Sequence, residues 1–436
     1  MLQIVAMSHA AVPFRMLEIG LLLGADRVRR PAGRESAIAE TIVEPASIEE
    51  IAELVRKCES DRIALAAFGA GRTLAELRRR PAELGISLKR MASVVAYEPD
   101  DMTVVSLAGM TVGGINRLTA SRRQRLGIDP PNPDRTTLGA AIGAAHAGPL
   151  RHSEGLVRDL LIGIQFVGHG GRVVRAGGRV VKNVAGYDLM KLLTGSFGTL
   201  GIVTEATFKV RPLPETYALI AAPCVAIEPA FAAAAKLHDS LPLLHLEVLS
   251  AGCGERFGYP RNCLLVAGIG GNDEEMTHQR AKIAEMLGSE HEVLEDARAD
   301  EAYRRLRDID LPAATFKAQL SVLPAAMARC LEAMEGSLRD RSGRLEFRAH
   351  AGAGVAQISV ACDLNAEDAS RLLVRWRSIV REAGGHLRLT AVAPALRATL
   401  PPFDQPSEGE MKLMRRLKAS FDPAGVFNPR SFVGGI

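Results

Sequence analysis

The sequence predicts an α+β fold that is divided into more than one domain. From Thr41 to Gly71 the chain reads as strand, helix, strand and glycine turn, which is the start of a βαβ unit. Two glycine-rich segments, 137–149 and 182–204, each lead towards a β-rich run, and helices and strands interleave between residues 215 and 400. The length of 436 residues exceeds what one core usually serves, so we expect two domains.

Composition excludes several functional classes. The formal net charge is +4, and no block of lysine and arginine stands out, so nothing favours nucleic-acid binding. The six cysteines are scattered without a CxxC pair, which argues against a disulfide framework, a metal site or an iron–sulfur cluster and fits a reducing cytoplasm. The apolar run Ile19–Leu23 is too short to span a bilayer, and we expect no transmembrane segment. Residues 1–35 are interpreted as an ill-defined N-terminal extension, with Met7 or Met16 as later candidates for the start.

The first unit ends in a turn that is a candidate for phosphate binding. Ser47 and Glu50 form the pattern of a helix N-cap, and a short apolar strand then runs into Gly69–Thr73. Glycines let backbone N–H groups approach an anion closely. Leu74 stands where a dinucleotide fingerprint needs its third glycine, and no Walker lysine follows. Taken alone, the turn is better explained as a tight turn after a strand.

The next segment combines strands with a run of small residues. A rigid extended stretch, 130–133, leads into residues 140–148, which have almost no side-chain bulk. A close-packed helix explains that run, and so does a surface on which a large flat ligand lies. Tyr187 and Asp188 are expected to stabilise their loop. Strands are expected at 94–97, 103–107, 161–167, 172–176 and 202–210, and helices at 113–121 and 189–193.

The region 215–400 predicts helices alternating with strands. This pattern is typical of helices packed against an antiparallel sheet. The predicted helices span 228–240, 273–287, 324–338 and 365–383. The predicted strands span 243–249, 264–268, 345–350, 357–361 and 386–391.

Three segments together resemble flavoproteins of the vanillyl-alcohol-oxidase type, which carry a PCMH-type FAD-binding domain, and in particular the FAD-binding subunits of bacterial glycolate oxidase. They are residues 137–163 (TLGAAIGAAHAGPLRHSEGLVRDLLIG), 177–214 (with KNVAGYD and GSFGTLGIVTE) and 421–429 (FDPAGVFNP). The resemblance implies an FAD-binding domain of two α/β subdomains over residues 36–214 and an α/β cap over 215–400. Residues 401–436 would then return to the FAD site.

The resemblance also implies which residues bind FAD. The turn Gly69–Thr73 corresponds to backbone that binds the diphosphate, the 137–143 segment lines the flavin and diphosphate, Ile202 contacts the adenine side, and Asn428 lies near the isoalloxazine ring. Family members that tether FAD often use a histidine near the first glycine turn, but none lies between His9 and His146, so we expect non-covalent FAD. The implied set is Gly69, Ala70, Gly71, Arg72, Thr73, Thr137, Leu138, Gly139, Gly143, Gly198, Gly201, Ile202 and Asn428.

The cap departs from the pattern of catalytic relatives. Dehydrogenases of 2-hydroxy acids in this superfamily carry a motif like HAGDGNxH that helps to hold a metal and the substrate. From His350 onward this chain has Ala353, Val355 and Gln357 where that motif has Asp, Asn and the second His. These replacements cannot form such a metal site. His350 is a weak catalytic candidate that more often has a structural role, and His386 and Arg388 share one face of a predicted strand, where a solvated edge is an equal alternative.

The resemblance implies an FAD-carrying subunit of a glycolate oxidase complex that oxidises glycolate to glyoxylate. It implies a second FAD-containing subunit and an iron–sulfur subunit as partners, because this chain has no cysteine cluster of its own. Such a chain would be either an accessory subunit or the subunit that oxidises the substrate. It would lie in the cytoplasm, either free or attached to the inner membrane through its partners. The alternatives are a stand-alone FAD-dependent dehydrogenase of a 2-hydroxy acid or alcohol, and a non-catalytic scaffold subunit.

Overall fold

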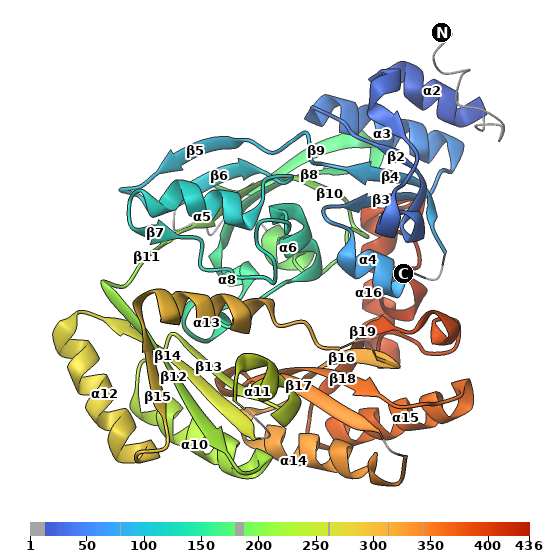
Figure 1. Ribbon diagram of the computed structural model, residues 1–436. Helices are drawn as coiled ribbons and strands as arrows, with labels where there is room; N and C mark the ends of the chain where they lie inside the picture. Colours follow the sequence, from blue (N-terminus) through green and yellow to red (C-terminus); the bar gives the residue numbers. More distant parts are fainter. Residues whose placement is uncertain (1–13, 79, 179–186, 260–261, 313, 342) are drawn as a thin grey trace.

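The computed structural model describes residues 14–78, 80–178, 187–259, 262–312, 314–341 and 343–436. In this part of the chain there are a four-stranded, a five-stranded and an eight-stranded sheet, and a two-stranded ribbon of β7 (Gln124–Arg125) and β11 (Arg211–Pro212). The four-stranded and five-stranded sheets form an N-terminal half, and the eight-stranded sheet forms a cap beneath it in Figure 1. The α+β class predicted from the sequence is confirmed.

The four-stranded sheet contains the predicted βαβ start. Its order is β1-β2-β4-β3, and β2 and β3 both run parallel to β4, which lies between them. The hydroxyl of Ser47 accepts a hydrogen bond from the N–H of Glu50 and caps helix α3 as expected. The elements are β1 (Val28–Arg29), β2 (Ala39–Val43), α3 (Ile48–Asp61), β3 (Leu65–Phe68), α4 (Arg72–Leu77) and β4 (Ala82–Ser87).

The five-stranded sheet is antiparallel throughout, in the order β5-β6-β10-β8-β9. The run of small residues contains helix α6, as one of its two interpretations required. The strands are β5 (Val94–Glu98), β6 (Thr103–Leu107), β8 (Leu161–Gly168), β9 (Arg172–Gly177) and β10 (Ile202–Lys209). The helices are α5 (Val112–Ala120), α6 (Leu138–Ala144), α7 (Arg151–Glu154), α8 (Val157–Leu160) and α9 (Leu189–Leu193).

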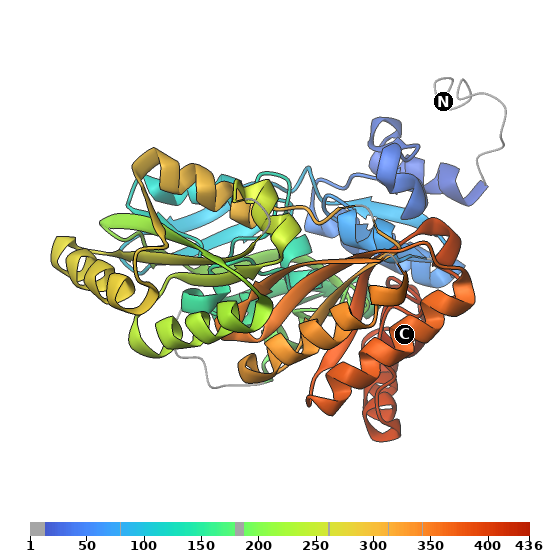
Figure 2. The same cartoon turned by 60° about the horizontal axis from the view of Figure 1, so that its bottom comes forward.

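The cap is one antiparallel sheet with most of its helices on a single face. The strand order is β15-β12-β14-β13-β17-β18-β16-β19, and the four predicted helices pack on that face around a large apolar core (Figures 1 and 2). These helices are α10 (Ile227–Ser240), α12 (Asp273–Leu287), α14 (Pro324–Gly336) and α15 (Ala366–Glu382). The predicted strands are β13 (His245–Leu249), β14 (Cys263–Gly271), β17 (Arg344–His350), β18 (Val355–Ala361) and β19 (His386–Val392).

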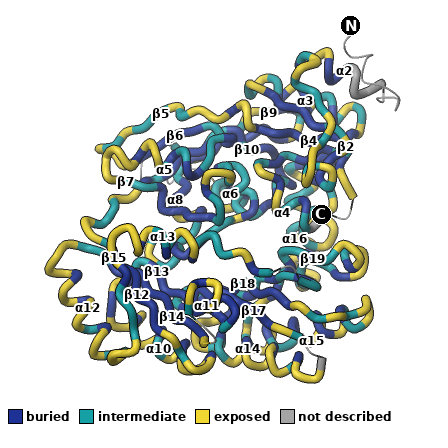
Figure 3. The backbone as a smooth tube through the Cα atoms, in the orientation of Figure 1, coloured by how far each residue is buried: buried dark blue, intermediate teal, exposed yellow. Residues whose placement is uncertain are grey.

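The opposite face of the cap sheet is covered unevenly. Helices α11 (Ala251–Phe257) and α13 (Asp296–Asp308) bury apolar residues against β12 and β14 at one end. At the other end β19 contacts α4 of the N-terminal half. Figure 3 shows the central strands buried and the outer helices exposed on one side. Three strands that the sequence patterns missed complete the sheet: β12 (Thr216–Cys224), β15 (Glu292–Glu295) and β16 (Phe316–Ser321).

The C-terminal segment returns to the first sheet. After α16 (Glu408–Phe421), the backbone of Phe427 forms a parallel bridge with Leu65 in β3. The Leu65 N–H donates to the carbonyl of Val426 at 2.9 Å, and the Asn428 N–H donates to the carbonyl of Leu65 at 2.8 Å. Phe427 is fully buried in the core beneath the four-stranded sheet, so this return is part of the N-terminal fold.

The structure corrects the interpretation of the N-terminus for residues 14–35. Helix α2 (Phe14–Leu23) buries Ile19 and Leu23 in the same core as α3. Beyond it, Arg27 pairs with Glu50 at 2.6 Å. The apolar run that is too short for a membrane is therefore one face of a packed helix, which a five-residue pattern does not reveal. Among the helices of the described residues, none is long and apolar enough to cross a bilayer.

We expect Leu23→Ala to lower the free energy of unfolding by about 2–5 kcal/mol, because it empties a buried site. Leu21 lies on the same helix but is 77% exposed, against 1% for Leu23. Leu21→Ala is therefore the matched control and should stay within about 0.5 kcal/mol of the wild type. Urea unfolding followed by circular dichroism measures both. Equal small effects would mean that α2 does not belong to the core.

Candidate functional site

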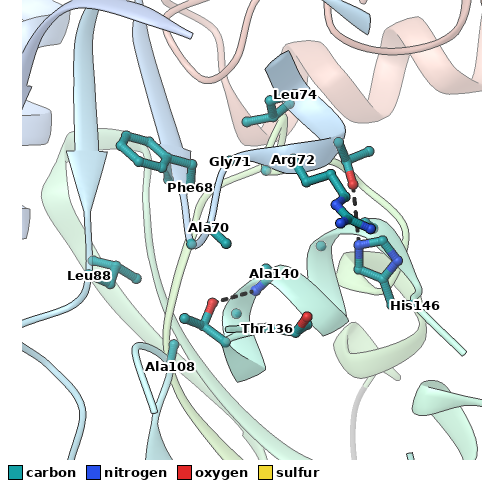
Figure 4. Close-up of a pocket in the computed structure, with 18 of the residues that line it drawn as sticks. Phe68, Ala70, Gly71, Arg72, Leu74, Leu88, Ala108, Thr136, Ala140 and His146 are labelled. Atoms are coloured by element: carbon teal, nitrogen blue, oxygen red, sulfur yellow. Dashed lines mark hydrogen bonds between the residues drawn. The ribbon is translucent and has the colours of Figure 1, made fainter. Parts of the chain in front are cut away.

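A cavity of about 210 Å³ lies in the N-terminal half, between the loop Gly69–Thr73, helix α6 and the turn that precedes β10 (Figure 4). It opens towards a second cavity of about 850 Å³, because Arg72, His146 and Phe197 line both. The second cavity lies between the N-terminal half and strands β16, β18 and β19 of the cap. The site therefore has an inner part, whose lining is rich in glycine and alanine, and an outer part, which the cap helps to line.

The loop Gly69–Thr73 offers backbone donors to the inner cavity. Gly71 has a φ of 72° and precedes α4, and a Cβ there would lie 2.4 Å from the side chain of Ile38. A Cβ on Gly69 would lie 2.2 Å from Oγ1 of Thr137, so the loop packs directly on α6. Among the described residues, no acceptor is recorded for the N–H groups of residues 69–71. Free N–H groups on a loop of this kind suit the oxygens of a phosphate.

Helix α6 forms the facing wall. Its first turn is capped by Thr137, whose hydroxyl accepts from the N–H of Ala140 at 3.2 Å, and the Gly139 N–H donates to the carbonyl of Ala108. Gly143 lines the cavity, and a Cβ on this residue would meet no atom within 4 Å. The wall is thus flat because side chains are missing on the cavity side and not because the backbone is strained. Leu138 points into the core and does not line the cavity.

The third wall depends on the C-terminal return. Gly198 has a φ of 68°, and a Cβ there would lie 2.8 Å from Nδ2 of Asn428. Nδ2 of Asn428 donates to the carbonyl of Phe197 at 2.5 Å, and its Oδ1 accepts from Arg78 at 3.3 Å. Asn428 is 1% exposed and lies behind the cavity wall. It therefore positions the turn at Gly198 and does not line the cavity.

The structure brings together the other residues that the sequence singled out. The lining shared by prediction and structure is Gly69, Ala70, Gly71, Arg72, Thr73, Thr137, Gly139, Gly143, Gly198, Gly201 and Ile202. Sequence reasoning missed Phe68 and Leu88, which carry no distinctive signal, and Arg34, which fell in the predicted extension. The KNVAG segment, 182–186, lies outside the described residues. Next to it, Asp188 caps helix α9 by accepting from the N–H of Lys191, and Tyr187 is 93% exposed, so the expected stabilisation of the loop by these two residues stays a prediction.

His146 stands at the junction of the two cavities. Its Nε2 lies 3.2 Å from Oγ1 of Thr73 (Figure 4). Burial, together with the charges of Arg388 and Arg72, lowers the pKa of His146 to about 4. The imidazole is therefore neutral near pH 7 and adds no charge to the inner cavity.

The cap candidates lie in two different places. His386 and Arg388 both line the outer cavity, as their shared strand face predicted, with His386 exposed. His350 lines neither cavity; its Nδ1 lies 2.6 Å from Oε1 of Glu247, and both residues are buried. Burial raises the pKa of Glu247 to about 8 and holds the pKa of His350 well below its ordinary value. The pair is therefore uncharged, with the carboxylic acid donating to the imidazole, and has a structural role.

The residues present fit FAD. The inner cavity offers free backbone N–H groups for a diphosphate and a wall with no side chain at Gly143 for a flat ring. No group of three or more His, Cys, Asp or Glu residues in the described ranges could hold a metal ion. Gln357 stands where the motif of the catalytic relatives has its second histidine. Its side-chain oxygen accepts a hydrogen bond from the guanidinium of Arg348 at 2.8 Å.

Comparison with known proteins gives two matching families. The FAD binding domain matches residues 39–177, and the C-terminal domain of FAD linked oxidases matches 219–389 and 403–432. Glycolate oxidase subunit GlcE of Escherichia coli is 28% identical over 383 residues, which cover 87% of this chain and 96% of that protein. Glycolate oxidase subunit GlcD of Bacillus subtilis is 32% identical over 182 residues, 41% of this chain and 38% of that protein.

A solved structure shows the same fold. p-Cresol methylhydroxylase with bound substrate has a TM-score of 0.73 at 14% identity and covers 96% of each chain. At that identity the likeness concerns the fold alone. The two family matches cover both the N-terminal half and the cap, and they support FAD as the cofactor.

We expect Gly143→Val to weaken FAD binding about tenfold or more, because the new side chain meets no protein atom and projects into the cavity where the cofactor would lie. The matched control is Gly336→Val, since Gly336 is an exposed helical glycine of α14 with equally open surroundings. The measurement is the FAD released into the supernatant by acid precipitation, per mole of folded protein.

Wild-type flavin content in the Gly143 variant would mean that α6 does not line the FAD site. Yellow colour retained in the acid pellet of the wild-type protein would contradict non-covalent attachment.

We expect Glu247→Gln to remove a pH dependence of stability. In the folded protein this carboxyl stays protonated up to about pH 8, whereas it ionises near pH 4 when unfolded. The folded state therefore binds the extra proton between these values, and stability falls as pH rises through this window. Between pH 6 and pH 8 the wild type should lose up to about 1.4 kcal/mol per pH unit more than the variant in urea unfolding. Parallel pH profiles would show that Glu247 is ionised in the fold.

Proposed function

Because this chain belongs to the family of FAD-linked oxidases, whose FAD-binding and C-terminal domains it carries, we propose that it is the FAD-binding subunit of a complex that oxidises glycolate to glyoxylate. It is an FAD-dependent oxidoreductase, and its relatives include a glycolate oxidase subunit matched along most of both chains. The observation that carries the proposal is the opening of the inner cavity into an outer cavity whose lining includes Arg72 and Arg388, for which the described residues show no salt bridge.

Each wall of the inner cavity would have its own task. The N–H groups of the loop Gly69–Thr73 would hold the diphosphate, and α6 would support the ring system through its backbone at Gly139 and Gly143. Asn428 would keep the turn at Gly198 in place. When bound, FAD supplies the capacity to accept two electrons from a substrate carbon. The protein's part is to orient the cofactor, to shield it from water and to admit the substrate from the cap side.

The cap supplies few groups for proton transfer. Glu247 and His350 are hydrogen-bonded to each other, and neither residue lines either cavity. The histidines that line the outer cavity are His146, which is a weak base, and His386, which is exposed at the rim. This supports an accessory role, in which a second FAD-containing subunit oxidises the substrate and electrons leave through an iron–sulfur subunit in the cytoplasm.

The test is an anaerobic titration of the complex isolated through a tag on this chain. We expect glycolate to bleach the flavin absorbance of the complex and to yield glyoxylate, measured as its phenylhydrazone. The chain purified alone should bind FAD and bleach far more slowly. The complex carrying Gly143→Val should contain less flavin, which reports the contribution of this subunit.

Two outcomes would overturn the proposal. If the isolated chain bleaches as fast as the complex, it is a stand-alone dehydrogenase. If glycolate leaves the complex yellow while another 2-hydroxy acid bleaches it, glycolate is not the substrate.

A further inference from the structure

Four polar side chains form a row across the cap sheet. The register aligns Arg348 of β17 with Gln357 of β18, Gln357 with Gln319 of β16, and Gln319 with Arg388 of β19. Residues directly opposite one another in neighbouring strands point to the same face of a sheet. We call this row, Arg348–Gln357–Gln319–Arg388, the cap shelf. Gln357, Gln319 and Arg388 line the outer cavity, so the cap shelf faces the N-terminal half.

Hydrogen bonds leave the cap shelf with more free donors than free acceptors. Arg348 donates to Oε1 of Gln357 at 2.8 Å, and Arg388 donates to Oε1 of Gln319 at 3.0 Å. A guanidinium has no acceptor, so each contact fixes the amide with its oxygen towards the arginine. The two amide NH₂ groups and the remaining N–H groups of Arg388 are then the polar groups available to a ligand. Such a set of donors selects an acceptor-rich, negatively charged partner.

The charge on Arg388 is not balanced within the described part of the chain. The recorded contacts of its guanidinium are the amide of Gln319 and the ring of Phe197, whose centroid lies 5.8 Å from Cζ. Burial lowers the pKa of Arg388, and no carboxylate acts against that effect. A partly buried cation without a counter-charge is costly, and an anion bound beside it would offset that cost.

The carboxylates on the cavity walls are already engaged. Asp310 contacts Lys317 at 3.2 Å, Asp404 contacts Arg377 at 2.9 Å, and Glu76 contacts Arg397 at 3.7 Å. Glu410 accepts from the hydroxyl of Ser407 at 2.7 Å at the start of α16. Within the described residues none of these four groups contacts Arg388, so its counter-charge would have to enter with a ligand.

The cap shelf also bears on the missing metal motif. Gln357 stands where catalytic relatives have the second histidine, and its amide oxygen is held by the fully buried Arg348. A divalent cation at this point would be repelled by the guanidinium. The positive charge that a metal would bring to a carboxylate is therefore supplied here by arginine side chains.

We propose that the cap shelf binds the carboxylate of a small hydroxy acid without a metal ion, with Arg388 as its direct charged partner and the amides of Gln319 and Gln357 as further donors. The geometry suits it, because a guanidinium can hold a carboxylate with two parallel hydrogen bonds. Phe197 and His146 line both cavities, so an acid on the cap shelf would lie beside the mouth of the FAD site. The identity of the ligand rests on the proposed function; the anion site itself does not.

The experiment titrates the FAD-loaded chain with oxalate, an unreactive analogue of a small hydroxy acid, and follows the flavin spectrum and the melting temperature. Oxamide, the uncharged counterpart, is titrated alongside, and both series are repeated with EDTA. The variants are Arg388→Gln, Arg388→Lys and the control Arg381→Gln. Arg381 also lines the outer cavity, but its side chain is 68% exposed and lies 3.8 Å from Asp404.

We expect oxalate to bind with a Kd that rises about thirtyfold or more in Arg388→Gln, since that change removes one partner of a buried charge contact. Arg388→Lys, which keeps the charge and loses the planar fork, should fall between this variant and the wild type. Arg381→Gln should stay within about threefold, as expected for an exposed charge. Oxamide should not bind, and EDTA should change nothing. The FAD content of each variant confirms that it is folded.

The cap shelf is refuted if oxalate fails to bind the wild type, if it binds Arg388→Gln equally well, or if EDTA abolishes binding. These failures are separate from failure of the proposed function. If oxalate binds through Arg388 but no glycolate is oxidised by the complex, the anion site stands and the proposed function falls. If the complex oxidises glycolate while oxalate ignores Arg388, only the cap shelf falls.

Discussion

The close approach of glycine backbone to neighbouring segments around the inner cavity is the constraint on which the rest of the structure depends. The loop at Gly69 lies against Thr137, α6 lies against Ala108 at Gly139, and the turn at Gly198 lies against Asn428. At the first and third of these positions a single Cβ would force the two segments apart. The three segments come from different parts of the chain, and together they give the cavity stretches of wall formed by glycine and alanine. The positions of β3, α6 and the C-terminal return follow from these contacts.

The face of the cap sheet that lies towards this cavity is polar, whereas its opposite face is apolar. On the side that bears four helices, alternate residues of its strands form an apolar core. On the other side the strands near β19 carry arginine, glutamine and lysine, and in the part of the chain described the cap helices α11 and α13 lie at the other end of this face. A face that is polar, partly buried and rich in donors is costly unless it binds something. An FAD-binding half and a donor-rich cap thus suit a flavoprotein that binds an anion between its two halves.

The residues of the cap that reach the outer cavity are only partly those of the motif that begins at His350. His350 keeps its place in the motif, yet it is turned towards Glu247 in the interior and does not reach the outer cavity. Arg388 and Gln319, which belong to no recognised motif, reach it together with Gln357. A motif read along one strand cannot show which neighbours the other strands supply, and here the neighbours decide what the site can bind.

The sequence by itself determined the α+β class and most of the helices and strands, whereas the residues of the inner cavity were implied by the resemblance of three segments to flavoproteins. The reason is local: apolar periodicity and glycine turns act within about ten residues of the chain. It was wrong about residues 14–35, because the burial of Leu23 depends on a core assembled from α3 and the C-terminal return. It also misjudged Leu138, whose side chain belongs to the core behind α6. Only the tertiary structure decided the cap shelf, since Arg348, Gln357, Gln319 and Arg388 meet through strand register between segments that lie up to 69 residues apart in the sequence.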